Sequence, residues 1–358
     1  MNKTLLLTDL HLTDKAPGYL DSQIDCIEDI VRKENPDDII IMGDVFMHRR
    51  PSPKVLLATK SLLEWMIAYL PCLYPFGRIH ILRGNHDSET KADDGLTALS
   101  LFEDKGLING IQVYTQTAGI TKRIKVSGLK DTCVFIPHYE DQNIIKSDLR
   151  RIKNGSVLFG HFGYSGCLNS LGNTDFDIKL SEFPCPTFLG HIHRYSASEK
   201  HEVVLLGTHY TTNFGEAGKD NYYGVFEDNE FKLRISKGGP KHIVAYYNDE
   251  YFLETLDIPE ENFVLLRIYI DPIKTKVNCF ELKEAILDRW DNVKSVDFTY
   301  KSSFDKLDDL SSHKESNKIF TIDEKLIKDY VKDNNAGIPF DDLMSGFYTL
   351  SEALNDNK

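Results

Sequence analysis

The first hundred residues alternate between short apolar runs and longer segments in which apolar residues recur at helical spacing. The apolar runs at residues 4–8, 38–42 and 78–82 predict strands of the buried type. Helical spacing predicts two helices between them, over residues 19–33 and 53–70. Because strand, helix, strand, helix, strand is the order of parallel βαβ units, we predict an α/β fold.

Beyond residue 100 the predicted strands are shorter and helices are fewer. We predict one helix at 142–153 and strands at 111–114, 123–126, 132–136, 156–159 and 186–189. Three further segments alternate like antiparallel strands of a second sheet, at 203–206, 222–226 and 231–235. Residues 1–240 are therefore predicted to form a two-sheet β-sandwich flanked by helices.

The pattern changes after the Gly-Gly-Pro sequence at residues 238–240. Residues 241–302 are predicted to form a small α+β capping or DNA-binding lobe, with strands at 263–270 and 293–300 and a helix at 280–290. Residues 303–358 are predicted to be a linker followed by C-terminal helices, at 323–332 and 340–354.

Composition narrows the class of protein. No apolar run approaches the roughly 20 residues of a membrane span, and the N-terminal apolar segment is too short for a signal peptide. The six cysteines are scattered without a C-x-x-C pair, which favours free thiols in a reducing, cytoplasmic setting: Cys26, Cys72, Cys133, Cys167, Cys185 and Cys279.

Charge is unevenly distributed along the chain, whose formal net charge is −13. Residues 241–358 carry 15 Lys and Arg against 24 Asp and Glu, and residues 1–240 carry 27 against 31. Because phosphate binding depends on Lys and Arg, so acidic a chain needs local basic patches, metal ions or a basic partner to bind nucleic acid.

Ligand-type side chains follow the predicted strands at their carboxyl ends. They are Asp9, His11, Asp44, Asn85, His86, His161, His191 and His193. In open α/β sheets this edge is where ligands bind. Imidazole, carboxylate and amide oxygen suit Mn²⁺, Fe²⁺, Zn²⁺ or Mg²⁺. Eight such residues exceed the needs of one tetrahedral ion but suit two ions that share a carboxylate.

Each of these residues, taken alone, has an ordinary interpretation. A lone histidine near a strand end is usually a surface or core residue, and five others are assigned to that class: His80, His138, His201, His242 and His313. An aspartate after a glycine is usually a turn residue. The signal is the ordered series at successive strand ends: Asp9-x-His11, Gly43-Asp44, Gly84-Asn85-His86-Asp87, Gly160-His161 and Gly190-His191-x-His193.

This ordered series resembles the signature of the calcineurin-like metallophosphoesterases. Two further segments resemble the SbcD-type DNA-repair nucleases within that superfamily. The first is Gly43-Asp44-Val45-Phe46 with residues 50–53, and the second is Gly207-Thr208 with residues 214–217 and 223–225. The resemblance covers residues 1–240, and beyond them only the layout is similar.

The resemblance implies a role for each residue at the site. Asp9, His11 and His193 would hold one metal ion, Asn85, His161 and His191 the second, and Asp44 would bridge them. The ions, Mn²⁺ with Mg²⁺ or Fe²⁺ as alternatives, would activate hydroxide for attack on phosphorus. His86 would act on the transition state or leaving oxygen, and Asp87 could orient His86.

One position departs from the pattern of these relatives. Some carry a substrate-facing histidine three residues after the bridging aspartate, where this chain has Met47, with His48 one place later. We hypothesise that His48 partly substitutes; otherwise it is a solvent-facing loop residue.

The core motifs do not decide between a nuclease and a small-molecule phosphatase. Basic clusters at residues 48–54, 122–125 and 150–153 favour a nuclease, although each also suits a solvated surface. The family implies 3′→5′ exonuclease activity on duplex ends, endonuclease activity on single strands, homodimerisation, and docking of the last helical segment on an SMC-like, SbcC-type ATPase. The alternatives are a stand-alone phosphodiesterase or phosphatase and a metal-free scaffold protein.

Overall fold

The computed structural model describes most of the chain up to residue 300, namely residues 3–70, 79–103, 110–116, 126, 129–153, 155–169, 172–173, 176–249, 251–260, 262–271 and 277–300. Contacts divide the chain into a unit of Met1–Ser302 and a second unit of Ser303–Lys358, and only the first is described. The linker, the two C-terminal helices and the predicted strand at 123–126, except for Val126, lie outside the described residues. The predicted boundary at residue 240 therefore stays a prediction.

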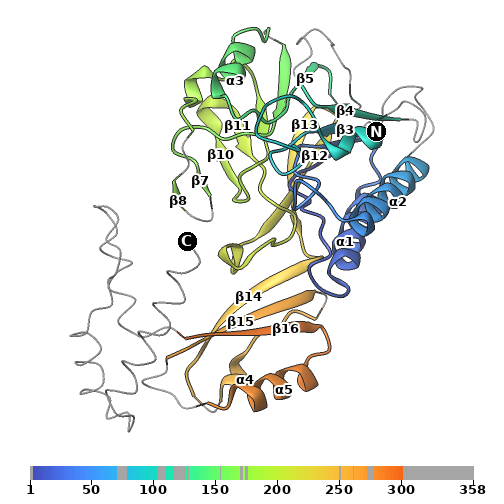
Figure 1. Cartoon of the computed structure of the whole chain (residues 1–358). Helices are drawn as coiled ribbons and strands as arrows, with labels where there is room; N and C mark the ends of the chain where they lie inside the picture. The colour runs from blue at the N-terminus through green and yellow to red at the C-terminus, as the bar shows by residue number, and fades with distance from the viewer. Residues whose placement is uncertain are drawn as a thin grey trace, which may run out of the picture. The chain divides into compact units, whose positions relative to one another are not determined.

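The N-terminal βαβ units form the larger sheet, whose strand order is β13-β12-β1-β2-β3-β4. Four of its strands run parallel: β1 (Lys3–Leu7), β2 (Asp38–Ile41), β3 (Ile79–Leu82) and β4 (Ile111–Tyr114). Helices α1 (Tyr19–Glu34) and α2 (Pro53–Tyr69) cover one face of this sheet (Figure 1). The sequence predicted these strands and helices to within one or two residues, because their apolar pattern is strong.

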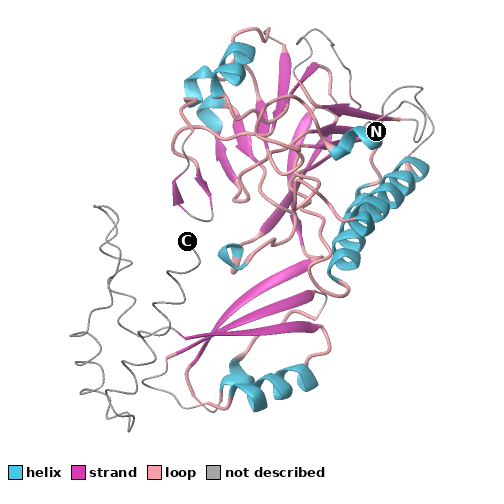
Figure 2. Cartoon of the chain, viewed as in Figure 1, coloured by secondary structure: helices cyan, strands magenta, loops and turns pink. Residues whose placement is uncertain are grey.

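The second sheet has the order β10-β11-β9-β6-β5. Its strands are β5 (Thr132–Ile136), β6 (Ser156–Gly160), β9 (Thr187–Leu189), β10 (Ser196–Ser198) and β11 (Val203–Leu205). Helix α3 (Gln142–Leu149) packs on its outer face, while a short hairpin of β7 (Leu168–Asn169) and β8 (Gly172–Asn173) follows β6. Helices therefore lie outside both sheets, as Figure 2 shows.

A buried apolar layer joins the inner faces of the two sheets. Leu6, Ile40 and Leu82 of the first sheet pack in one cluster with Phe135 and Phe159 of the second. Burial of this size supplies most of the stability of such a sandwich, since each fully buried large apolar side chain contributes roughly 1.5–3 kcal/mol. The predicted two-sheet sandwich with flanking helices is confirmed.

The sequence assigned two strands to the wrong sheet. Strands β12 (Asn221–Glu227) and β13 (Glu230–Ser236) were expected in the second sheet, but β12 pairs antiparallel with β1 in the first sheet, with Lys3 opposite Glu227. Only β10 and β11 form an antiparallel pair in the second sheet. Alternation of apolar residues identifies a strand but not its neighbour, and here the chain returns to pair with its own first strand.

A small three-stranded parallel sheet follows, formed by β14 (Pro240–Tyr247), β15 (Phe263–Ile270) and β16 (Val293–Tyr300). Helices α4 (Phe252–Thr255) and α5 (Cys279–Arg289) cover one of its faces around a separate apolar cluster. Sequence reasoning missed β14 and α4. Tyr19 of α1 contacts Phe263 of β15 edge to face, which ties this sheet to the first one.

The cysteines and the hydropathy of the helices bear on the expected cellular setting. None of the five described cysteines, a set that omits Cys72, forms a disulfide. Within the described ranges, no helix is long and apolar enough to cross a membrane.

His80 makes the stability of the fold dependent on pH. It lies on β3 beside the stacked rings of Tyr114 and Phe135, with its Nδ1 3.1 Å from the Tyr114 hydroxyl, and burial lowers its pKa from 6.5 to about 4. The unfolded chain therefore takes up a proton first as the pH falls, so stability is full above pH 6.5 and declines between pH 6.5 and 4. As the pH falls from 6.5 to 4, protonation of this histidine in the unfolded chain is expected to lower the free energy of unfolding by about 3 kcal/mol.

Replacement of His80 by phenylalanine, which retains the ring stack, should remove that share of the pH dependence. Urea unfolding in EDTA at pH 7 and pH 4 measures the difference. The same substitution at His48, an exposed residue, serves as the control. Equal pH dependence in all three proteins would contradict the expectation.

Candidate metal centre

All eight predicted ligand-type residues converge at the carboxyl ends of strands from the two sheets. Asp9 and His11 follow β1, Asp44 follows β2, and Asn85 and His86 follow β3. From the second sheet, His161 follows β6, and His191 and His193 follow β9. Burial of so many polar side chains is costly unless they pair or bind an ion.

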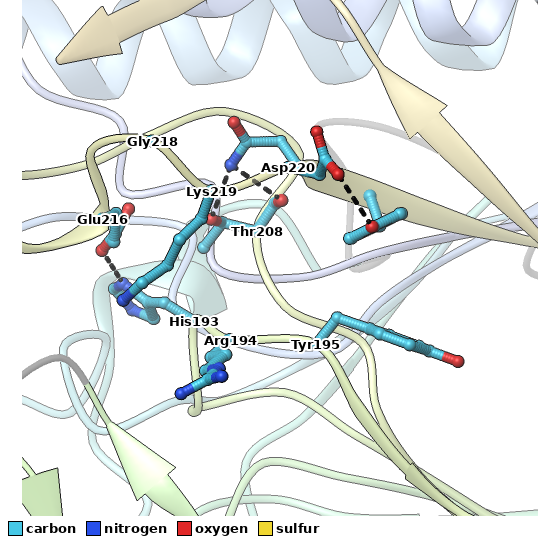
Figure 3. Close-up of a pocket in the computed structure, with 10 residues that line it drawn as sticks. His193, Arg194, Tyr195, Thr208, Glu216, Gly218, Lys219 and Asp220 are labelled. Atoms are coloured by element: carbon cyan, nitrogen blue, oxygen red, sulfur yellow. Dashed lines mark hydrogen bonds and ion pairs between the residues drawn. The ribbon is translucent and has the colours of Figure 1, made fainter. Parts of the chain in front are cut away.

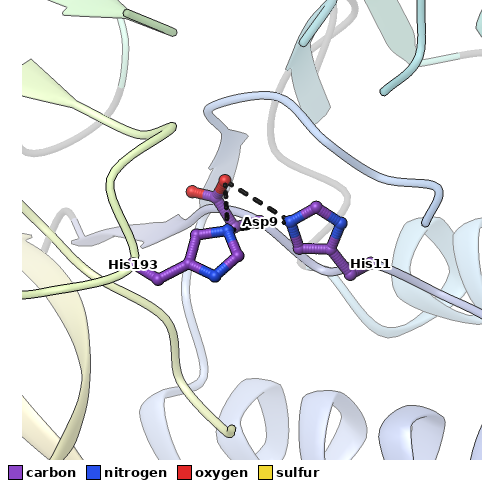
Figure 4. A group of neighbouring side chains, drawn as sticks. All are labelled: Asp9, His11 and His193. Carbon is purple, nitrogen blue, oxygen red and sulfur yellow. Dashed lines mark hydrogen bonds and ion pairs between the residues drawn. The ribbon is translucent and has the colours of Figure 1, made fainter. Parts of the chain in front are cut away.

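The first group consists of Asp9, His11 and His193, whose ligand atoms lie within 4.8 Å of one another. The Nε2 atoms of His11 and His193 are 3.0 Å apart, and Asp9 Oδ1 lies 3.5 Å from the Nε2 of His193 and 3.8 Å from that of His11 (Figure 4). Asp9 Oδ1 is buried and has no hydrogen-bond partner among the described residues. A cation held by these three atoms would satisfy it.

The second group brings Asp44, His161 and His191 together within the same limit. The amide oxygen of Asn85 joins them, at 3.1 Å from His161 Nε2 and 2.7 Å from His191 Nδ1. This set matches the ligands that the family resemblance implied for the second ion.

Asp44 lies between the two groups. One of its carboxylate oxygens is 3.4 Å from His161 Nε2, and the other is 3.7 Å from His11 Nε2. Its side chain is 2% exposed. The donor set, the unpartnered oxygen of Asp9 and this shared carboxylate fit two divalent cations side by side.

The backbone at these ligands has an unusual conformation. Four of them have positive φ angles: Asp9 (53°), His11 (44°), Asp44 (51°) and His191 (76°). These angles lie in the left-handed region, which residues other than glycine rarely adopt. Such outliers concentrate where the surrounding structure requires a particular side-chain direction.

Gly84 allows the loop after β3 to reach the site. A Cβ atom at this position would lie 2.1 Å from Asp44 Oδ1 and 2.3 Å from the Asp44 backbone nitrogen. Any other residue would therefore displace the shared carboxylate, which explains why Gly84 precedes Asn85.

The electrostatics of the metal-free site separate its histidines into two classes. Burial opposes the charge of His161 and His193, but nearby carboxylates outweigh it: Asp44 raises the pKa of His161 to about 9, while Asp9 and Glu216 raise that of His193 to about 10. Burial lowers the pKa of both His11 and His191 to about 4. Despite burial, neighbouring histidines hold the pKa of Asp44 well below its usual range. Because ligand histidines must be neutral, cation binding displaces protons from His161 and His193.

Hydrogen bonds on the far side of the rings present the remaining nitrogen to the site. His161 Nδ1 is 2.6 Å from the Met42 carbonyl oxygen, so it donates there and leaves Nε2 for a ligand contact. His193 Nδ1 lies 2.6 Å from Glu216 Oε1 in the same way. Partners of this kind fix the tautomer and raise the basicity of a ligand histidine.

Glu216 is a functional residue to which sequence reasoning gave no role. It lies in the 3-10 helix η4 (Phe214–Glu216), within one of the segments that resemble the nuclease branch. The Thr212 amide and the side chains of Thr212 and Asn213 donate hydrogen bonds to its carboxylate, so its direction is fixed. The resemblance of this segment to the nuclease branch could have drawn attention to Glu216. Its contact with His193, 23 residues away in sequence, could not be predicted locally.

Replacing Glu216 by glutamine is expected to weaken metal binding by the first group about 10- to 100-fold, because His193 loses its charged partner. Titration of the metal-free protein with Mn²⁺, followed by calorimetry, measures this loss. Glu199→Gln provides a control on an exposed carboxylate. Unchanged affinity in the Glu216 variant would show that Glu216 does not tune this ligand.

His86 lies beside the metal groups, but its partner is not the predicted one. Its ring meets that of His11 edge to face at 4.9 Å, and its Nδ1 is 2.6 Å from the Met47 carbonyl oxygen. Asp87 instead accepts hydrogen bonds from the backbone amides of Gly84, Val45 and Phe46. The expectation that Asp87 orients His86 is corrected: the Met47 carbonyl holds His86, and Asp87 holds the loops after β2 and β3 together.

Two further buried histidines lie beside the site. His138, assigned to the ordinary class, stacks on His191 with ring centroids 5.5 Å apart, and burial lowers its pKa to about 3. His209 is buried near Asp9, and burial lowers its pKa to about 3 as well. His138 follows its strand without a preceding glycine, whereas His209 directly follows Gly207-Thr208, so a local signal was present only for His209.

The loop after β2 carries His48, whose side chain is exposed and belongs to neither ligand group. Its substitution for a substrate-facing histidine stays a prediction. Arg49 of the same loop donates to the carbonyl oxygens of Ser88 and Thr90, at 3.0 and 2.9 Å. Arg49 therefore holds the loop after β3 in place. Its guanidinium is less available for phosphate contact than the predicted basic cluster at residues 48–54 implied.

A two-sheet sandwich with paired His and Asp groups at its strand ends defines the metallophosphoesterases as a class. The family model of the calcineurin-like phosphoesterases matches residues 3–245, and the chain belongs to this family. It is accordingly a hydrolase of phosphoester bonds whose family uses divalent metal ions.

Comparison with other proteins adds little beyond the family. No curated protein matches the sequence. Among solved structures, the chain is similar to the Pseudomonas putida nuclease MPE at 13% identity and a TM-score of 0.30, over 64% of this chain and 87% of that one. A similarity at this level carries no argument about substrate.

Proposed function

We propose that this protein is a metal-dependent DNA nuclease of the SbcD type, with Mn²⁺ as its preferred ion. The observation that carries the proposal is the position of Glu216. This residue comes from a segment that resembles the nuclease branch, and it holds the ligand histidine His193 at 2.6 Å. The segment is thus part of the metal centre rather than a remote similarity.

The chain's own residues would divide the work of phosphodiester hydrolysis. Asp9, His11 and His193 would hold one cation, Asn85, His161 and His191 the other, and Asp44 would contact both. Bound there, the cations supply hydroxide near neutral pH and neutralise charge at the phosphorus. His86, held through Nδ1 by the Met47 carbonyl, would keep Nε2 free to stabilise or protonate the departing oxygen.

Cleavage of labelled DNA tests the proposal. Linear duplex and single-stranded DNA, labelled at one end, are incubated with Mn²⁺, Mg²⁺ or EDTA. We expect Mn²⁺-dependent 3′→5′ degradation of duplex ends and cutting of single strands. Full activity on a nucleotide or nitrophenyl ester that DNA does not inhibit would instead favour the alternative of a small-molecule phosphodiesterase. Absence of bound metal would favour a scaffold protein.

The proposal extends to partners. By resemblance, the nuclease would form a homodimer in the cytoplasm and work with an SMC-like, SbcC-type ATPase in DNA repair, recombination or replication. The sequence segment for docking, residues 338–354, carries a broad apolar stripe suited to helix-in-groove binding. Deletion of residues 320–358 should abolish ATPase binding while leaving Mn²⁺-dependent nuclease activity. Retained binding would contradict this assignment.

A further inference from the structure

A pocket with a volume of about 300 Å³ lies directly beside the first ligand group (Figure 3). It is formed by the segment that follows β9 and by the loop that leads into β12. His193 and Glu216 belong both to its wall and to the metal centre. A molecule bound in this pocket would therefore lie next to the reacting phosphorus.

Two basic side chains line the pocket, Arg194 and Lys219. Arg194 is exposed and, within the part of the chain that the structure describes, has neither a hydrogen bond nor an ion pair from its guanidinium. Lys219 Nζ donates to the Gly215 carbonyl oxygen at 3.1 Å, which leaves its other protons available. Both positive charges can therefore contact an anion without breaking an existing ion pair.

The acidic side chains of the pocket do not cancel this charge. Both Glu216 oxygens accept hydrogen bonds from Thr212, and Oε1 also contacts His193. The Glu216 carboxylate is therefore already paired within the protein. Asp220 accepts a long hydrogen bond from the Tyr222 hydroxyl at 3.4 Å. The lining thus offers two cationic side chains that form no ion pair among the described residues, against one exposed carboxylate, which suits a phosphate group.

The pocket also has an aromatic wall. The rings of Tyr195 and Tyr222 lie 5.1 Å apart between centroids and are inclined at 46°, and both side chains are half-buried. Tyrosine rings held in this way provide stacking surfaces for nucleic-acid bases of any sequence. A phosphomonoester of a small alcohol would use the basic residues but would leave these rings without a partner.

We infer that this pocket is the subsite for the nucleotide adjacent to the scissile phosphodiester. Its base stacks on Tyr195 and Tyr222, and its own phosphate contacts Arg194 and Lys219. The inference rests on the proposed nuclease function and adds to it a reason for recognising a single strand, because a base can enter the pocket only when it is unpaired.

Cleavage of short single strands at several salt concentrations tests the phosphate contact. Arg194→Gln is expected to raise KM about tenfold and to reduce the slope of log(kcat/KM) against log[salt] by about one. The matched control is Lys200→Gln, which removes an exposed positive charge outside the pocket. Identical salt slopes in the Arg194 variant, the control and the wild type would overturn the phosphate assignment.

A set of tetranucleotides, each with one abasic position, tests the base contact. In the wild type, one abasic position should raise KM about tenfold, as expected for the loss of one stacked base. In Tyr195→Leu this difference should become smaller, since the variant has lost one of the two stacking rings. An equal abasic penalty in both proteins would overturn the assignment of the rings.

The outcome also separates this inference from the proposed function. Failure of the wild type to cleave any oligonucleotide, with hydrolysis of bis(p-nitrophenyl) phosphate retained, would contradict the nuclease proposal itself. Cleavage of oligonucleotides by the wild type, with both variants behaving like Lys200→Gln, would contradict only the subsite.

Discussion

Replacement of Asp44 by asparagine is expected to lower turnover at least a thousandfold. The amide is nearly isosteric and can still accept the hydrogen bond that the His86 amide donates to Oδ1 at 2.8 Å. What it removes is the negative charge that both ligand groups share. Two cations held close together then lose the anion between them, and His161 loses the carboxylate that raises its pKa.

The measurement combines turnover with metal content. Rates on single-stranded oligonucleotide and on a nitrophenyl diester should fall together, and mass spectrometry should find fewer than two bound ions per chain. Asp228→Asn provides the matched control, because Asp228 is exposed and shares the positive φ of Asp44. Turnover above about a tenth of the wild-type value at saturating metal would show that Asp44 is not the shared ligand.

The second large effect separates two neighbouring residues. His86→Gln is expected to slow turnover by about 10²- to 10⁴-fold while both ions remain bound, because the loss of a general acid affects the chemical step. Asn85→Ala should instead weaken metal binding, since it removes the amide oxygen next to His161 and His191. Raising the metal concentration should restore activity to the Asn85 variant but not to the His86 variant.

The alternative is that His86 is itself a metal ligand, because its ring nitrogen lies within 4.8 Å of ligand atoms of His11 and Asp44. A His86 variant that loses metal as readily as the Asn85 variant would make His86 a ligand. The bond from Nδ1 to the Met47 carbonyl is present in either case, so metal content decides between the two roles.

The sequence predicted which side chains meet at this edge because those residues obey a local rule. Each follows a buried apolar run, and parallel strands bring such positions to one edge of a sheet. Glu216 follows no such rule, since it contacts His193 from 23 residues away. His138 does follow the buried strand β5, but nothing in its own segment indicates that its ring stacks on His191. Pairing between remote strands is equally invisible locally, which is why β12 was assigned to the wrong sheet.

Asp87 shows a different limit. Its place beside His86 in the chain suggested that it would contact that ring, but its neighbour in space is the backbone of the loop after β2. Burial and the charge of Asp44 raise its pKa to about 6, while three amide contacts keep it in place. Adjacent residues on a tight turn point in different directions, so sequence adjacency is a poor guide to a shared role.

The left-handed backbone at the ligands implies that this centre is maintained at the expense of the fold. Each non-glycine residue in that conformation costs on the order of 1 kcal/mol, and Asp9, His11, Asp44 and His191 all adopt it. Glycine at any of the four would relieve strain in the metal-free chain while removing a ligand. Selection for thermostability alone would therefore drive these positions toward inactive sequences, and a more stable working enzyme must be sought by substitutions elsewhere.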